Sequence, residues 1–292
     1  MVQIKAILTI VLLAIVSVVL IPLQWCAVKF GLSIQRRLPL VWHRLALGLV
    51  GIRVRQIGKP CERRPLLIAS NHASWVDITV IGSLMPLSFI AKSEVAGWPV
   101  FGLFAKLQRS VFVNRTKRSD TGKVADTIAG RLKSGDAMVL FAEGTSNDGN
   151  VVLPFRSALL GSATRALDAD GGDVWVQPLS IAYQGIHGLP MGRQFRPGVA
   201  WYGDMELAGH LWGVFVNGAL DVIVTWGEPT LVHHETDRKA LTVQMENQVR
   251  SMTVAALTGA AVKSACDLEN SGGNLFSNAE KTSKAGAEKS AA

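Results

Sequence analysis

The sequence predicts an α/β protein, a mixed β-sheet flanked by helices, with a membrane-embedded helical segment at its N-terminus. Three observations predict this class. The first 50 residues are dominated by apolar side chains. Beyond Gly51, short apolar runs alternate with stretches of helical periodicity, which is the pattern of a layered α/β fold. The length of 292 residues is enough to bury the core of one large domain or two small ones.

The composition favours a membrane-associated protein. Hydrophobic residues make up 49% and charged residues 18% of the chain, and the mean hydropathy is +0.27. The net charge of +8 suits anionic lipid headgroups or an acidic carrier protein. Nucleic acid is a weaker alternative, because the sequence has no zinc-finger spacing, arginine-rich helix or aromatic RNP-like run. Three widely separated cysteines, Cys26, Cys61 and Cys266, indicate a reducing compartment without a disulfide framework.

The N-terminal 50 residues are expected to form two membrane helices. Residues 6–25 are nearly all apolar and can just cross a bilayer or lie deep in it. A cleaved signal peptide is the alternative, but the apolar stretch is long and no Ala-x-Ala site follows. Residues 38–50 mix apolar side chains with His43 and Arg44, which is typical of an interfacial helix. The two segments therefore form either a full span or a hairpin in one leaflet.

The charges that follow the first apolar segment predict its orientation. Basic residues gather on its C-terminal side, at Lys29, Arg36, Arg37 and Arg44. The positive-inside rule then places the rest of the chain on the cytoplasmic side of the inner membrane. We expect membrane helices over 1–50 and an enzyme domain over 51–262. The polar residues 263–292 are expected to be a disordered tail.

The alternating patterns of the domain predict its elements. Strands are expected at 53–57, 65–69, 87–91, 111–113, 137–141, 174–182 and 220–226. Helices are expected at 76–84, 99–107, 120–132 and 238–257. Pro178 falls within an apolar run, which normally indicates an edge strand or a bulge.

A histidine and an aspartate lie five residues apart directly after one predicted strand, as His72 and Asp77. On an ideal helix, side chains five apart point about 140° away from each other and cannot meet. If the chain turns after the strand and a helix begins near Ser74, His72 can fold back onto Asp77. The carboxylate would then fix the imidazole tautomer, leaving the other ring nitrogen as a base that takes a proton from a hydroxyl.

Two further groups follow predicted strands. Glu143-Gly144-Thr145-Ser146 follows the strand at 137–141, at the kind of strand end where sites gather in open α/β sheets. Arg115 follows the strand at 111–113, and a guanidinium is well suited to holding a phosphate or a carboxylate.

The order of these motifs resembles the 1-acylglycerol-3-phosphate acyltransferase family. The resemblance covers residues 65–183 and rests on His-x4-Asp, a strand ending in arginine, Phe-x-Glu-Gly-Thr and an apolar-Pro-apolar strand. It implies that His72 is the general base and that Asp77 orients it. The acyl donor would be a thioester on acyl carrier protein or coenzyme A, with no metal or redox cofactor. The acceptor would be bound by Lys92, Arg115, Glu143, Gly144, Thr145 and Ser146.

Three departures from the family's motifs bear on the acceptor. Ala142 replaces a proline, Ser146 replaces an arginine and Arg109 replaces a glycine. A charge-assisted hydrogen bond contributes about 1.5–3 kcal/mol, so the missing arginine argues against a phosphomonoester such as lysophosphatidic acid. Arg109 is expected to compensate if the acceptor is a phosphomonoester after all.

The segments 143–157, 200–205 and 210–212 resemble a bacterial branch that acylates lyso-ornithine lipid. That acceptor has a zwitterionic amino-acid headgroup, and its hydroxyl belongs to a 3-hydroxy fatty acyl chain. We therefore expect an O-acyltransferase that makes ornithine lipid, the alternative being a lysophosphatidic acid acyltransferase that makes phosphatidic acid.

Other classes of function have less support in the sequence. Water as acceptor would make the protein a thioesterase, and loss of catalysis would leave a lipid-binding scaffold. No Gly-x-Ser-x-Gly elbow and no P-loop occurs. The remaining histidines lack metal-ligand spacing. Trp75 lies inside the first motif and is expected to shape the mouth of an acyl channel.

Overall fold

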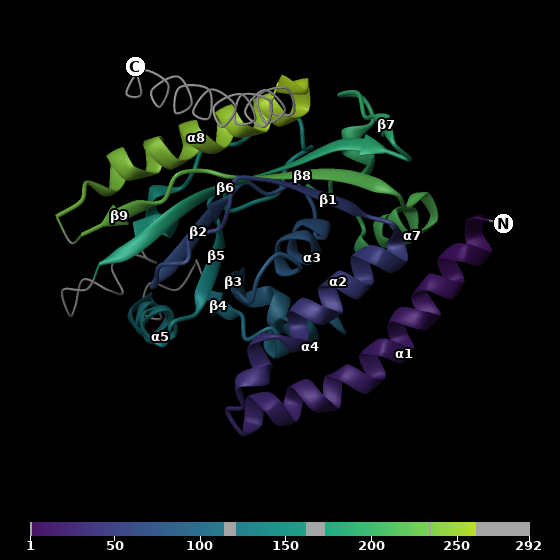
Figure 1. Cartoon of the computed structure of the whole chain (residues 1–292), viewed down its shortest axis with the longest axis horizontal. Coiled ribbons are helices and arrows are strands. Elements are labelled where there is room, and N and C mark those ends of the chain that lie inside the picture. Colours follow the sequence, from purple (N-terminus) through teal and green to yellow (C-terminus); the bar gives the residue numbers. More distant parts are fainter. Residues whose placement is uncertain (1, 114–120, 162–172, 234, 261–292) are drawn as a thin grey trace, which may run out of the picture.

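The computed structural model describes residues 2–113, 121–161, 173–233 and 235–260. Its centre is a nine-stranded mixed sheet with helices on both faces, as the sequence predicts (Figure 1). The main path of the sheet runs in the order β1-β8-β6-β2-β5-β3-β4, and β7 and β9 pair with β6. The strands are β1 (Arg53–Ile57), β2 (Leu66–Ser70), β3 (Ser88–Lys92), β4 (Val111–Val113), β5 (Ala137–Phe141), β6 (Val174–Ile186), β7 (Leu189–Pro190), β8 (Leu220–Trp226) and β9 (Thr230–Val232).

The strand directions determine where the functional residues lie. β2 runs parallel to β5 and β6, while β3 runs parallel to β5 and β4. The carboxyl ends of β2, β5, β3 and β4 therefore lie side by side and form one edge of the sheet, an edge made of strand ends and not of an outer strand. The motifs of His72 and Glu143 begin at this edge, where β2 and β5 end, and Lys92 ends β3 there.

Alternating side chains of the strands pack into helical layers on both faces. On β2, Leu66 and Ile68 join a cluster with α2 (Leu38–Val50) and α3 (Val76–Gly82), whereas Leu67 and Ala69 join the cluster with α5 (Thr121–Lys133) and α8 (Arg238–Thr258). All five residues of β2 are buried, as its continuous apolar run predicts. The helices of the domain are α3 (Val76–Gly82), α4 (Phe101–Leu107), α5 (Thr121–Lys133), α7 (Leu207–Asn217) and α8 (Arg238–Thr258), preceded by α2 (Leu38–Val50).

The edge strand predicted from Pro178 is wrong, because β6, which contains this proline, lies inside the sheet between β2 and β8. The N–H of Trp175 donates to the carbonyl of Pro65, on the side of β2. Because backbone groups alternate in direction along a strand, those of Pro178, three residues later, point away from β2. On that side, β6 pairs with β9 up to Val176 and with β8 from Leu179. The proline stands at the change of partner, where the ladder does not need its missing N–H.

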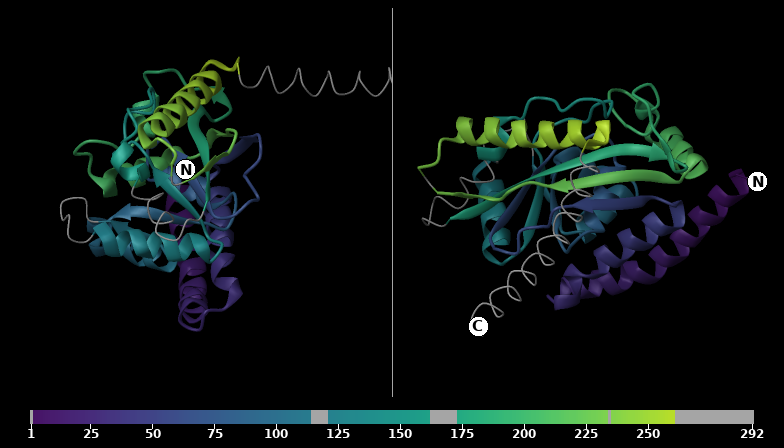
Figure 2. Two further views of the ribbon diagram at one scale, coloured as in Figure 1. Left: turned by 90° about the vertical axis from the view of Figure 1, so that its left-hand side faces the viewer. Right: turned by 45° about the horizontal axis from the view of Figure 1, so that its top comes forward.

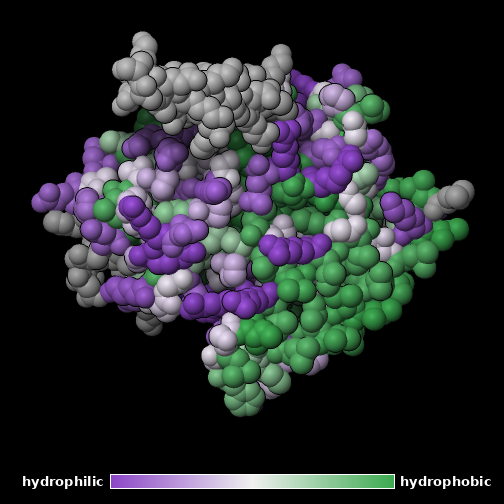
Figure 3. Space-filling model, viewed as in Figure 1, coloured by the Kyte–Doolittle hydropathy of each residue, from purple (hydrophilic) through white to green (hydrophobic). Residues whose placement is uncertain are grey.

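The helix α1 (Val2–Lys29) is longer than the predicted 6–25 segment and is long and apolar enough to cross a membrane. It lies beside α2 along one side of the domain (Figure 2). The side chains that α1 buries are mostly small or polar, whereas its outer side chains are mostly Leu, Ile and Val. Figure 3 shows the resulting continuous apolar surface. The buried residues are Ala6, Thr9, Leu13, Ser17, Gln24 and Ala27.

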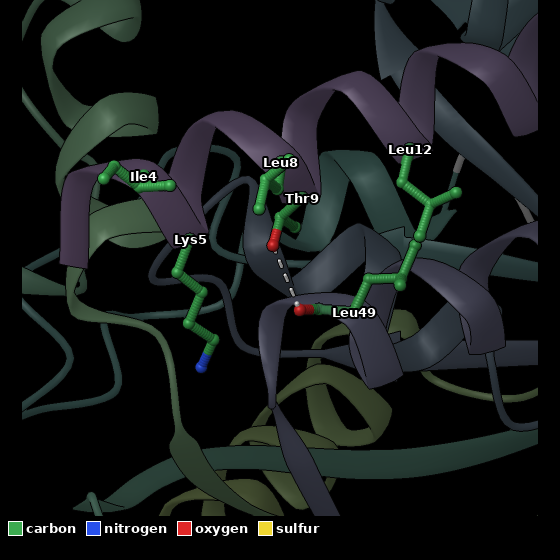
Figure 4. A pocket seen from close by; sticks show the side chains of 6 residues that line it. All are labelled: Ile4, Lys5, Leu8, Thr9, Leu12 and Leu49. Atoms are coloured by element: carbon green, nitrogen blue, oxygen red, sulfur yellow. Dashed lines mark hydrogen bonds between the residues drawn. The ribbon is translucent and has the colours of Figure 1, made fainter. Parts of the chain in front are cut away.

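Hydrogen bonds attach α1 to the domain along its length. Thr9 Oγ1 donates to the carbonyl of Leu49 at 3.5 Å (Figure 4), and Trp42 Nε1 donates to Ser17 Oγ at 2.9 Å. Near the other end, Gln24 Nε2 donates to the carbonyl of Leu107 at 2.7 Å. The inward polar stripe therefore docks the helix on α2 and α4.

Candidate active site

The turn between β2 and α3 brings His72 and Asp77 together. The strand ends at Ser70 and the helix begins at Val76, which is the first residue of the helix predicted over 76–84. His72 Nδ1 lies 2.8 Å from Asp77 Oδ2. The strand–turn–helix geometry expected for this pair is therefore present.

Both oxygens of the Asp77 carboxylate accept hydrogen bonds, although the side chain is fully buried. Oδ2 also accepts from the N–H groups of Ala73 at 2.7 Å and Ser74 at 2.9 Å. Oδ1 accepts from the hydroxyl of Tyr183 at 2.5 Å. Because the carboxylate acts only as an acceptor, His72 Nδ1 carries a hydrogen and Nε2 is left with its lone pair.

Aromatic stacking fixes the plane of the imidazole. The ring of His72 lies 3.9 Å from the ring of Phe141 with an interplanar angle of 16°, and Phe141 stacks in turn on Phe89. The side chain of His72 is 18% exposed, whereas Asp77 is 0% exposed. The base is thus held from one side by a carboxylate and from one face by a phenyl ring, and it opens to the surface.

Glu143 is buried beneath this turn, and its carboxylate meets the backbone of His72. One oxygen accepts the N–H of His72 at 3.3 Å, and the other accepts Asn147 Nδ2 at 2.7 Å. The N–H of Asn147 returns a bond to the carbonyl of His72 at 3.2 Å. Burial raises the pKa of Glu143 to about 8, against the opposing effect of these hydrogen bonds. The predicted contact of Glu143 with the acceptor stays a prediction, since the carboxylate positions His72 here.

The residues around Glu143 explain this motif locally. Gly144 has a φ of 75°, a left-handed conformation that favours glycine in the turn after β5. The N–H of Ala142 donates to the carbonyl of Ser70 at 3.0 Å, a bond that the proline common in this family could not make. Thr145 is exposed and Ser146 is half-buried, so both side chains reach the surface at the same edge.

Two predicted acceptor-binding residues follow the next strands along this edge. Lys92 ends β3 and is exposed. One strand, β5, separates it from β2, so it stands about 10 Å across the edge from the strand that carries His72. Arg115 lies outside the described residues, two positions after the end of β4.

Arg109 does not compensate for the missing arginine, contrary to the sequence-based expectation. Its guanidinium contacts Asp136 at 2.8 Å, together with Arg36 and Arg131. Asp136 precedes β5 whereas Glu143 follows it, so this cluster lies about 20 Å away at the other end of the strand. The φ of 62° at Arg109 explains why this position suits the glycine that is usual in the family.

Sequence reasoning missed several residues that hold the motif. Asn71 forms two hydrogen bonds of 2.9 Å with the backbone of Ile181, one in each direction. Tyr183, two residues further on β6, binds Asp77. Trp75 Nε1 donates to His210 Nδ1 on α7 at 3.0 Å. The sequence did offer one signal for Tyr183. A tyrosine within an apolar, buried strand needs a hydrogen-bond partner for its hydroxyl.

A groove of about 370 Å³ lies away from these residues, on the two N-terminal helices (Figure 4). The side chain of Lys5 stands at one end of it, and the other lining residues are mostly apolar. It belongs to the apolar surface of the helix pair and not to the site at His72. Its lining residues are Ile4, Lys5, Leu8, Thr9, Leu12 and Leu49.

Comparisons with known proteins agree with this geometry. The family described as Acyltransferase matches residues 51–182. A lyso-ornithine lipid O-acyltransferase of Brucella abortus is 52% identical over 250 residues, 85% of this chain and 94% of the relative. One of Rhizobium meliloti is 45% identical over 249 residues, 85% of each chain.

A more distant relative and a solved structure are also similar to this chain. A 1-acyl-sn-glycerol-3-phosphate acyltransferase of Neisseria meningitidis is 31% identical and covers 68% of this chain and 73% of its own. The crystal structure of the 1-acyl-sn-glycerophosphate acyltransferase of Thermotoga maritima has the same fold, with a TM-score of 0.56. It is 21% identical and covers 87% of this chain and 96% of its own. The chain therefore belongs to the acyltransferase family and is an O-acyltransferase.

Proposed function

We propose that this enzyme transfers a fatty acyl group to the hydroxyl of lyso-ornithine lipid and so makes ornithine lipid. The observation that carries the proposal is the similarity to the two lyso-ornithine lipid O-acyltransferases over 85% of this chain. Ser146 supports it, because the arginine suited to a phosphomonoester is missing at an accessible position beside the base.

The geometry at His72 suits direct acyl transfer. The lone pair of Nε2 takes the proton of the acceptor hydroxyl as its oxygen attacks the thioester carbonyl. The C–S bond then breaks, and the leaving thiolate takes the proton from the imidazolium. Asp77 stabilises the transient positive charge on the ring and holds its tautomer. The reaction uses no metal or redox cofactor.

The acyl donor is a thioester of acyl carrier protein or coenzyme A. Both donors are strongly acidic, and the net charge of +8 on the chain suits either one. At the catalytic edge the donor's thioester must reach Nε2 of His72, and Lys92 stands within about two strand spacings. Lys92 and Arg115 are the proposed contacts for negatively charged groups of the substrates.

The enzyme works at the cytoplasmic face of the inner membrane, with the α1–α2 pair embedded in one leaflet. Polar bonds near both ends of α1, from Thr9 and Gln24, support a docked helix over one that leaves the domain to span the bilayer. The exposed Leu, Ile and Val side chains of α1 support contact with lipid tails. This placement gives the site direct access to a single-chain lipid acceptor.

The second candidate acceptor is lysophosphatidic acid. The relatives of that name support it at 31% identity over 68% of this chain. Ser146 argues against it, and Arg109 is tied to Asp136 at the far end of β5.

Lipid mass spectrometry of cells that lack the gene tests the proposal. The expected result is loss of ornithine lipid with accumulation of its lyso form, restored by the wild-type gene but not by His72→Ala. Depletion of phosphatidic acid with ornithine lipid unchanged would instead support the second candidate.

A further inference from the structure

We propose that Tyr183 is a positioning residue of the catalytic pair, whose hydroxyl sets how strongly Asp77 attracts the proton on His72. This inference rests on the proposed role of His72 as the base. Tyr183 comes from β6, 106 positions after Asp77, and is 2% exposed. Its hydroxyl donates to Asp77 Oδ1 at 2.5 Å, the oxygen that His72 does not use.

The hydroxyl can act only as a donor to this carboxylate. Burial and the adjacent charge of Asp77 raise the pKa of Tyr183 well above its usual value, so the proton stays on the phenol. A side-chain hydrogen bond with Ser74 occupies the same hydroxyl from the turn. The phenol therefore withdraws charge from Asp77 at every pH at which the enzyme works.

The backbone around Tyr183 fixes the position of the ring. Two residues earlier, Ile181 is bound to Asn71 in both directions. The carbonyl of Tyr183 accepts Nε of the buried Arg196 at 3.3 Å. Hydrogen bonds thus join β6 to the His72 turn at two points, between Asn71 and the backbone of Ile181 and between Tyr183 and Asp77, and they hold the phenol against the carboxylate.

Removing the hydroxyl of Tyr183 should shift the pH–rate profile in a predictable direction. Without the hydroxyl, the negative charge on Asp77 is less compensated, and the protonated form of His72 is stabilised. The acidic limb of the pH–rate profile, where protonation of the base stops the reaction, must then move to higher pH. The other groups near His72 are Glu143 below it, Arg156 bound to the carbonyl of Glu143, and His210 behind Trp75. None of them changes in a Tyr183→Phe variant.

The experiment measures kcat, KM and the pH profile of purified Tyr183→Phe in lipid micelles. We expect kcat to fall about tenfold, the equivalent of one hydrogen bond to a charged group, with both KM values unchanged. We also expect the acidic limb to shift to higher pH. Tyr202→Phe is the matched control, because the chain's other tyrosine is not one of the four hydrogen-bond donors described at Asp77. An unshifted limb would overturn the proposal even if the rate fell, because it would leave only a packing role.

A second variant keeps the test decisive if Tyr183→Phe does not fold. Biosynthetic incorporation of 3-fluorotyrosine into the Tyr202→Phe protein labels Tyr183 alone, and the more acidic phenol is a stronger donor. The acidic limb should then move to lower pH, opposite to the Phe variant, and no movement would reject the inference. If the acidic limb does not move in either protein while His72→Ala is inactive, only the role of Tyr183 is rejected. If His72→Ala is active, the proposed function itself is rejected.

Discussion

The His72 turn and the helix α1 both bury polar side chains, but they do so against different surroundings. At the turn, the buried carboxylate of Asp77 is satisfied by four donors, and the reactive ring above it opens outward. On α1, Thr9, Ser17 and Gln24 face the protein while Leu, Ile and Val face outward. In water such a helix would pack the other way round.

The difference shows what polar burial does in each place. At the turn it gives a precise orientation to one reactive group. On α1, in the lipid environment proposed for it, polar burial provides attachment, because lipid tails compete poorly for hydrogen bonds and apolar packing has no advantage over contact with lipid. Substitutions at the turn should therefore affect chemistry without affecting location, and substitutions on the outer face of α1 should do the opposite.

The largest expected effect is that of His72→Ala. Loss of the general base should lower kcat by about 10³-fold, the middle of the range of about 10²–10⁴-fold that proton transfer by a positioned side chain contributes. The variant should keep its melting temperature and its partition into liposomes, measured by flotation. Residual transfer within tenfold of the wild type would contradict the role of His72.

Asp77→Asn should cost about 10²-fold or more in kcat. The neutral amide can no longer compensate the positive charge of the imidazolium, and an NH₂ group turned toward the turn would face the N–H donors of Ala73 and Ser74. Steady-state kinetics with saturating lysolipid measure the effect. A near-normal rate would mean that the carboxylate only supports the turn.

The outer face of α1 tests the other half of the comparison. Leu8→Lys combined with Val18→Lys places two charges where the side chains are 63% and 72% exposed. Each charge costs up to about 2.5–3.5 kcal/mol, the value for the centre of a membrane helix, so flotation should show the enzyme released from liposomes. The matched Ala substitutions at both positions should remain bound. Turnover of a water-soluble short-chain acceptor should persist in both variants, and its loss would tie α1 to the chemistry.

Glu143→Gln should have the smallest effect at neutral pH and a characteristic pH dependence. With a folded pKa of about 8 against 4.5 for the free group, the folded protein binds the extra proton between these values. The contribution to stability is therefore fully present below about pH 4.5 and is lost as the pH rises through about 8. The melting temperature of the wild type should fall relative to Glu143→Gln across this window. Parallel curves would show that Glu143 is not neutral in the fold.

Much of the fold could be predicted because the strands of this domain are buried and continuous in their apolar pattern. Residues 137–141 and 220–226 were predicted with the bounds that the structure has. Pro178 misled the prediction because its effect depends on a partner change between β9 and β8 that only the folded sheet shows. α7, with mixed apolar and glycine residues, was not predicted.

The residues of the site likewise divide into those that local sequence could predict and those that depend on contacts between distant segments. His72 and Asp77 could be paired from the sequence because the turn between them is local. Tyr183 could not, because it meets Asp77 through the pairing of β6 with β2. Arg109 was misassigned because its position relative to the sheet edge depends on which end of β5 it meets. Contacts between distant segments thus supplied what local pattern could not.

A competition assay tests the central claim most directly. The purified enzyme, given one acyl thioester and equal amounts of lyso-ornithine lipid and lysophosphatidic acid, is followed by mass spectrometry of both products. We expect ornithine lipid to form in large excess and His72→Ala to form neither product. Preferential formation of phosphatidic acid would contradict it.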